Sequence, residues 1–316
     1  MDERRRKSIV LTLVVSSGFL AFLFLLFCFI GSSKPATPAV PNPNGYDDFV
    51  RAAQLLIGAP RDYGSMAFDE LRGLVTTNRE VLHLVNQGLN RQCRVALDFV
   101  NTNAADHLKT LSELKRVGQL MAAQGWLAQL EGRTNDAVSS YLDTIRFGQE
   151  CSRGGPGIDR VVGIASESMG VTALRQLAGN LDAKRSREAA KALEKIHHHR
   201  PPLADTLNTE KQLFLSYSTL FQRIRARIPI PAINPTRTYY QSLTIKARAI
   251  EFQTKQLLIE LAAHAYKLEH GRSPSSLLAL VPSYLSAVPI DPETGTSMDF
   301  LPMQTRRKES GGEDMR

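Results

Sequence analysis

The sequence predicts a mainly α-helical protein: an N-terminal transmembrane helix, an extracytoplasmic helical domain and a small C-terminal α/β-hairpin appendage. Three observations predict this fold class. Residues 9–30 carry no charged side chain, and most of the remaining chain repeats its apolar residues with helical spacing. No stretch alternates Val, Ile and Thr over the length of a strand, so we expect β-structure only as a short pair near residues 287–300.

The apolar segment is long enough to cross a membrane. With a helical rise of about 1.5 Å per residue, residues 9–30 extend about 33 Å, enough for a hydrocarbon core of about 30 Å. The apolar region of a cleaved signal peptide is shorter, roughly 7–15 residues. We therefore expect residues 9–30 to remain as an anchor in membrane lipid. Cleavage after Ser33 is the alternative.

Charge predicts the direction of the anchor. Arg4, Arg5, Arg6 and Lys7 lie directly before it, and positive charge next to a span stays in the cytoplasm. Residues 1–8 are thus expected to form a cytoplasmic tail. The rest of the chain is expected outside the cytoplasm, on a single-pass protein of the bacterial cytoplasmic (inner) membrane.

The chain beyond the anchor divides at its prolines and glycines. Four prolines make residues 31–45 a semi-rigid linker. Residues 46–228 are expected to form the α-helical domain, with helices at about 107–131, 135–153, 158–178, 186–199 and 203–228 separated by glycine and proline breaks. Asp47 and Asp48 fit a first helical turn, and Thr77-x-x-Glu80 fits a capping box.

The C-terminal part begins after a second proline-rich stretch. Residues 229–237 form that connection, and residues 238–305 hold a long helix, expected to stop at Gly271, followed by shorter elements. Residues 306–316 are polar and are expected to be disordered.

The composition argues against nucleic acid as a partner. The formal net charge is +8, but the densest basic runs, around Arg185 and around Arg225, have no interleaved aromatic residues. A solvated helix face, or a diffuse basic surface facing anionic lipid or cell-wall polymer, accounts for them instead. The chain has three cysteines. Cys28 lies in the anchor, and we expect Cys93 and Cys151 to be free buried thiols. A disulfide between them is the alternative outside the cytoplasm.

The sequence predicts no catalytic, cofactor-binding or metal-ligating residue and no cofactor. The consecutive histidines of residues 197–199 point roughly 100° apart on a helix, so they do not converge on one ion. Glu260 and His264 share a helix face, as an ordinary surface pair does. Residues 154–157 are glycine-rich but lack the Gly-Lys-Ser/Thr of a phosphate loop, and Trp126 is expected in the core.

Residues 107–153 resemble a degenerate tetratricopeptide hairpin. Gly125, Gly132, Ala137 and Tyr141 have the spacing of its small and aromatic positions, at which two helices pack closely around a ring. An ordinary antiparallel helix pair is the alternative. A single copy does not make a solenoid, since such repeats need about three copies to bury a continuous core.

The C-terminal segment is similar to that of type II secretion pseudopilins. Tyr266 is followed by Gly271-x-x-Pro274, and Val288-Pro289-x-Asp291-Pro292 follows further on, where pseudopilins end a helix and turn into a small sheet. The likeness covers this segment only, because Gly18-Phe19 lies inside the apolar span, unlike a prepilin-peptidase site. The whole chain resembles uncharacterised bacterial single-pass membrane-anchored proteins, and this resemblance implies no activity.

These features together favour a membrane-anchored, non-enzymatic helical binding or scaffold protein of the cell envelope. Such a protein is expected to bind a protein partner. One alternative is a cell-envelope hydrolase whose catalytic residues form no recognisable motif. Another is an accessory component of a pilus-like secretion system. A pocket with convergent histidines and carboxylates would favour the hydrolase, whereas a concave groove within residues 107–178 would favour binding.

Overall fold

The structure is a computed structural model that describes residues 39–58, 62–96, 104–217 and 235–298. It has two compact units, Met1–Ala39 and Val40–Arg316, and nearly all described residues belong to the second. The expected anchor of residues 9–30, the cytoplasmic tail and the polar C-terminal tail lie outside the described residues. Among the helices that are described, none combines the length and the apolar character needed to cross a bilayer.

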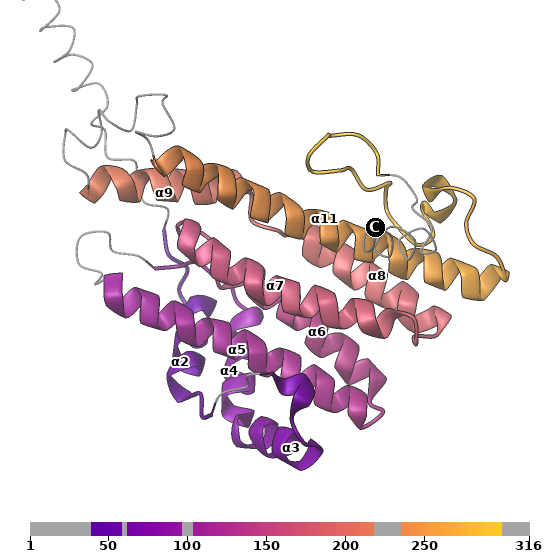
Figure 1. Ribbon diagram of the computed structural model, residues 1–316, viewed down its shortest axis with the longest axis horizontal. Helices are drawn as coiled ribbons and strands as arrows, with labels where there is room; N and C mark the ends of the chain where they lie inside the picture. The colour runs from indigo at the N-terminus through magenta and orange to yellow at the C-terminus, as the bar shows by residue number, and fades with distance from the viewer. Residues whose placement is uncertain (1–38, 59–61, 97–103, 218–234, 299–316) are drawn as a thin grey trace, which may run out of the picture. The chain divides into compact units, whose positions relative to one another are not determined.

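The prediction of a mainly helical protein is confirmed (Figure 1). The described residues contain no β-strand, and an isolated antiparallel bridge joins Ile290 and Ser297, inside the region where a strand pair was expected. The short helical turns are η1 (Tyr63–Ser65) and η2 (Leu277–Leu280). The α-helices are α2 (Gly45–Leu55), α3 (Phe68–Thr77), α4 (Arg79–Leu89), α5 (Ala104–Leu130), α6 (Thr134–Glu150), α7 (Gly157–Ala178), α8 (Ala183–His198), α9 (Leu203–Tyr217) and α11 (Pro235–His270).

The helices pack in nearly the order of the chain. Helices α5, α6 and α7 lie side by side in the middle of Figure 1, and α2, α3 and α4 pack on α5 and α6. On the other side, α11 packs on α7 and α8. One apolar cluster joins α6, α7, α8, α11 and η2, and a second joins α2, α4, α5 and α6. Helix α6 therefore contributes to both clusters.

Two expected boundaries differ in the structure. Thr77 does not begin a helix, so the capping-box prediction is wrong. Thr77 is the last residue of α3, and Asn78 precedes α4. The Asn78 side chain instead holds the backbone of Ile57, with N–O distances of 2.8 and 2.9 Å. Residues 235–237, expected in the proline-rich connection, form the first turn of α11, because proline at the first helical position gives up no intrahelical bond.

Hydrogen bonds join the residues at the start of α2 to the segment that follows α4. Asn44 caps α2 by accepting a hydrogen bond from the Tyr46 amide, and its side chain also exchanges hydrogen bonds of 2.9 and 3.0 Å with the backbone of Arg94. The Gly45 amide donates to the Gln92 carbonyl at 2.9 Å. Asp47 and Asp48 lie in the first turn of α2, as expected.

Small residues bring α5, α6 and α7 close together. A Cβ atom placed on Gly125 of α5 would lie 2.4 Å from the ring of Tyr141 on α6. One placed on Gly148 of α6 would lie 2.4 Å from the Gly163 carbonyl oxygen on α7, and the reverse distance is 2.2 Å. Any side chain at these positions would push the helices apart, so the glycines set how closely the helices pack.

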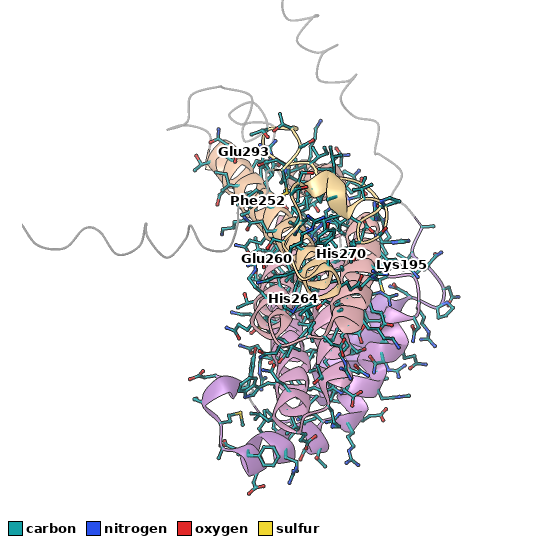
Figure 2. All side chains as sticks on the ribbon, turned by 90° about the vertical axis from the view of Figure 1, so that its right-hand side faces the viewer. Lys195, Phe252, Glu260, His264, His270 and Glu293 are labelled. Atoms are coloured by element: carbon teal, nitrogen blue, oxygen red, sulfur yellow. The ribbon has the colours of Figure 1, made fainter. Side chains whose placement is uncertain are left out.

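The segment after α11 packs back onto that helix. Helix α11 ends at His270, and Gly271 has a φ of 69°, which confirms the expected stop. Leu277 and Leu280 of η2 are buried against α11, whereas Leu278 is 72% exposed. Figure 2 views this end of α11, with Glu260, His264 and His270 labelled. The chain beyond Gly271 is thus a packed appendage through residue 298.

A pair of glycine substitutions tests the turn between α5 and α6. Gly132 has a φ of 73° and Gly73 lies inside α3, and an added Cβ would meet no neighbour at either position. Gly132→Ala forces a left-handed conformation on an L-residue and should lower the free energy of unfolding by about 1–2 kcal/mol. Gly73→Ala should raise it by about 0.4–1 kcal/mol. Urea unfolding of residues 40–305 measures both, and equal effects would contradict the assignment.

Candidate functional site

A groove opens between α3, α4, α5 and α6. It consists of a hollow of about 550 Å³ and an adjoining one of about 220 Å³. Leu82, Asn86, Gln124 and Arg133 line both hollows. The combined volume falls within the range of about 300–1,000 Å³ that is usual for ligand sites.

Helical spacing directs one polar stripe into this groove. Arg79, His83 and Asn86 follow one another on α4 at intervals of four and three residues, so they share a helix face. The opposite face of α4 is buried through Val81 and Leu84. Burial of that face therefore holds the polar stripe toward the groove.

The larger hollow is basic. Arg72, Arg79 and Arg133 line it together with a single carboxylate, that of Glu131. Glu131 lies 3.4 Å from Arg72 Nε and 2.6 Å from Arg133 Nη2. The hydrogen bond from Arg133 lowers the pKa of Glu131. Arg79 and His83 make no ion pair with another described residue, so the charge of Arg79 and the hydrogen-bonding groups of both side chains remain open to a ligand.

The smaller hollow has the opposite character. Asp136, Asp143, Ser139 and Ser140 line it, and Arg133 is its one cation among the described residues. Arg133 is ion-paired with Asp136. Burial raises the pKa of Asp143, and the nearby Arg146 guanidinium opposes that shift. The groove thus changes from basic to acidic along its length.

Two side-chain amides lie where the basic hollow meets the acidic one. Asn86 and Gln124 line both hollows, and neither amide makes a hydrogen bond with another described residue. An amide offers two donor hydrogens and an acceptor oxygen, the same groups that a peptide backbone presents. Asn86 and Gln124 are therefore suited to contact a polypeptide.

A second polar cluster is buried rather than open. Glu167 of α7 is fully buried and lies 3.1 Å from Arg160 Nη1 and 2.8 Å from Arg200 Nη1. Arg200 also donates a 3.2 Å hydrogen bond to Thr254 of α11. These contacts join α7, the end of α8 and α11. The sequence does not indicate this cluster, because Arg200 lies 33 positions from Glu167 and reaches it only when the chain after α8 packs against α7.

A buried histidine–aspartate pair links α5 and α7. His107 Nε2 lies 3.0 Å from Asp159 Oδ2, and Asp159 is completely buried. Burial raises the pKa of Asp159, and the hydrogen bond with His107 opposes the shift. Such a carboxylate can orient an imidazole for proton transfer. Within the described residues, no hydroxyl or thiol is hydrogen-bonded to His107.

The histidines of residues 197–199 differ in their hydrogen-bond partners, and the ring centroids of His197 and His198 lie 6.3 Å apart. The rings of His198 and His199 contact the carbonyl oxygens of Glu194 and Lys195 at 2.9 and 2.8 Å. Burial lowers the pKa of His197 to about 4, and Arg200 and Lys255 contribute to that shift. No group of three ligating side chains occurs in the part of the chain that the structure describes.

Glu260 and His264 do not act as a pair. Glu260 lies 2.9 Å from Arg175 Nε on α7, whereas His264 Nε2 lies 3.0 Å from the Leu181 carbonyl oxygen (Figure 2). Residues 154–156 lie in the connection between α6 and α7, and Gly157 begins α7. Trp126 is partly buried and packs against the cluster of Leu71, Ala123 and Leu127.

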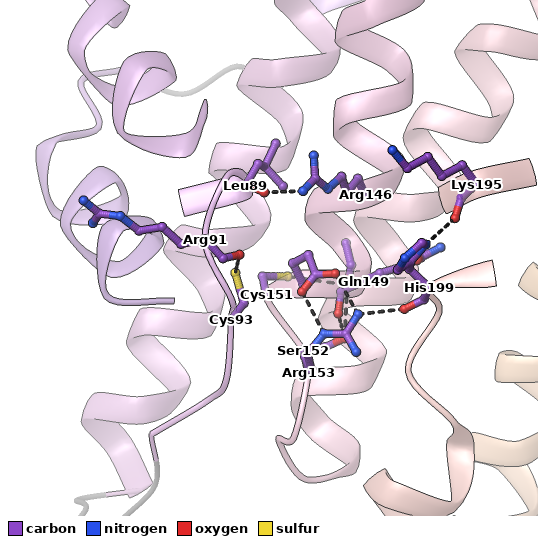
Figure 3. Close-up of polar contacts among 12 residues, drawn as sticks. Leu89, Arg91, Cys93, Arg146, Gln149, Cys151, Ser152, Arg153, Lys195 and His199 are labelled. Carbon is purple, nitrogen blue, oxygen red and sulfur yellow. Dashed lines mark hydrogen bonds and ion pairs between the residues drawn. The ribbon is translucent and has the colours of Figure 1, made fainter. Parts of the chain in front are cut away.

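Cys93 and Cys151 are both free and buried, as expected (Figure 3). The two thiols belong to the same apolar cluster. Burial raises the pKa of the Cys93 thiol to about 12 and moves that of Cys151 well above its ordinary value. Both thiols are therefore protonated at neutral pH.

The importance of the buried ion-pair cluster can be measured against a surface pair. Glu167→Gln leaves Arg160 and Arg200 without a counter-charge and should lower the free energy of unfolding by about 3–5 kcal/mol. Glu260→Gln breaks the partly exposed pair with Arg175 and should cost about 1 kcal/mol or less. Urea unfolding of the two variants gives the comparison, and a cost of less than 1 kcal/mol for Glu167→Gln would contradict the assigned role.

His197 makes stability depend on acidity. Its pKa is about 4 in the folded chain and about 6.5 when unfolded, so between these values the unfolded chain binds more protons. The contribution of His197 to stability therefore falls as the pH drops from 6.5 to 4. In His197→Gln the difference in unfolding free energy between pH 7 and pH 5 should shrink. His198→Gln, at the exposed neighbour, is the control and should leave that difference unchanged.

Comparison of the chain with protein-family models, with curated proteins and with solved structures finds no match. The groove and the buried clusters therefore carry the functional argument alone.

Proposed function

We propose that this chain is a membrane-anchored, non-enzymatic helical binding or scaffold protein of the cell envelope, and that its groove holds a segment of a partner protein. The observation that carries this proposal is the pair of open amides, Asn86 and Gln124, at the centre of a groove. Polar groups that have no partner within the protein can bond to a ligand without first breaking an internal hydrogen bond.

The make-up of the groove supports binding rather than chemistry. The apolar side chains that line it are almost completely buried, namely Leu82, Val85, Met121 and Leu127, so the groups that the groove offers to a ligand are mainly polar. Polar and charged groups of this kind orient a bound partner. The carboxylates of Glu131 and Asp136 are both held by Arg133, so they have the character of structural ion pairs.

The anchor is the second part of the proposal. Residues 9–30 would hold the protein in the cytoplasmic membrane, with residues 1–8 in the cytoplasm. The proline-rich residues 31–45 would hold the helical unit away from the bilayer on its outer side. A partner would then be bound outside the cytoplasm, at a distance from the bilayer that this linker sets.

Site-specific photocrosslinking in intact cells tests this function. Thr76 is exposed and lines the larger hollow, and Ser242 is exposed on α11. A photoreactive residue at position 76 should give a discrete crosslinked protein that position 242 does not give. No product at position 76, or the same products at both, would contradict the proposal. A pilin captured at position 76 would favour the pilus-like alternative.

A further inference from the structure

We propose that the groove recognises an extended peptide segment of the partner in one orientation, with an acidic residue at the Arg79 and His83 end and a basic residue at the Asp143 end. The proposal rests on the proposed function and specifies the partner's chemistry. It follows from the distribution of charge along the groove.

The basic end offers a cation that is free to bind. Arg72 is paired with Glu131 and Asp69, and Arg133 with Glu131 and Asp136, which leaves Arg79 as the arginine of the larger hollow without a carboxylate partner among the described residues. Arg79 and His83 make no ion pair with any described residue. A carboxylate of a bound segment would complete this end through charge-assisted hydrogen bonds.

The smaller hollow forms the acidic end of the groove. Arg133 is the one described cation in the smaller hollow, and it is already paired with Asp136 and Glu131. Asp143 keeps a carboxyl group toward this hollow, beside Ser139 and Ser140. Arg146, which approaches Asp143, uses its guanidinium to bind the Leu89 carbonyl of α4. A lysine or arginine of the ligand fits here, and an acidic residue is repelled.

The open amides lie where the middle of the segment would pass. Asn86 follows Arg79 by seven residues on α4, which is about 10 Å along a helix axis. An extended chain covers that distance in about three residues, at about 3.3 Å each. The acidic residue should thus lie about three positions from the peptide units that Asn86 and Gln124 contact.

A polyanion fits this groove less well than a peptide does. A phosphate polymer or an anionic membrane surface would match the larger hollow, but Asp136 and Asp143 would repel it from the smaller one. A dipolar groove with open amides at its centre matches a chain that carries both charges and a peptide backbone.

Selection from a random linear dodecapeptide display library, against the full chain in detergent, tests the inference. Selected peptides should carry acidic residues toward one end and basic residues toward the other, always in the same order. Arg79→Glu with His83→Glu should weaken a selected peptide at least tenfold, and replacing its acidic residues by lysine should restore binding to that variant. Arg248→Glu, at an exposed position of α11, is the control and should leave binding unchanged.

Three outcomes would overturn the inference. One is selection of peptides without the charge order. Another is a selected peptide whose affinity is unaffected by the Arg79→Glu/His83→Glu variant. The third is displacement of the peptide by inorganic polyphosphate or phosphatidylglycerol vesicles at lower concentration than by unlabelled peptide, which would indicate a polyanion site. In each case a crosslinked partner at position 76 would still support the proposed function, whereas its absence would remove that function too.

Discussion

The close contact of α6 with α7 is the constraint on which the rest of the structure depends. Gly148 and Gly163 let the two backbones touch, since a Cβ on either would come within 2.4 Å of the other's carbonyl oxygen. A Cβ on Gly148 would also lie 2.8 Å from Glu167 Cγ. The contact therefore fixes the position of the buried carboxylate that receives Arg160 and Arg200. Since α6 contributes to both apolar clusters, the same contact sets the place of α4 and α5, and hence the width of the groove.

The polar residues divide by burial into two groups with different roles. Those around Glu167 have their charges compensated inside the protein, and they join α7 to α8 and α11. Those around Asn86 and Gln124 are open, and they lie on the other side of the α5–α6 pair. Charged groups that are paired inside the protein specify how the helices pack, whereas polar groups that face the groove are available to a ligand. One helical pair thus borders a closed polar cluster on one face and an open groove on the other.

The parts of the fold that follow from local chemistry could be predicted from the sequence. Gly132 and Gly271 end their helices in left-handed conformations, and the breaks between helices lie where glycine and proline cluster. The groove could not be predicted, because Asn86 and Gln124 meet only after four helices have packed. Glu167 and Thr254 likewise meet through Arg200 from distant helices. The capping-box prediction at Thr77 failed for the same reason: the chain around Ile57 makes Asn78 the important side chain there.

Chemical labelling of the two buried thiols would report when the helices packed around them separate. Cys93 lies in the segment after α4 and Cys151 at the end of α6, and both are shielded from solvent and protonated at neutral pH. The thiolate is the form of cysteine that attacks an alkylating reagent, so neither sulfur reacts while α2, α4 and α6 stay together. The rate of labelling then measures how often these helices separate. Because the groove wall includes α4 and α6, the labelling rate of Cys93 and Cys151 also reports how often that wall comes apart.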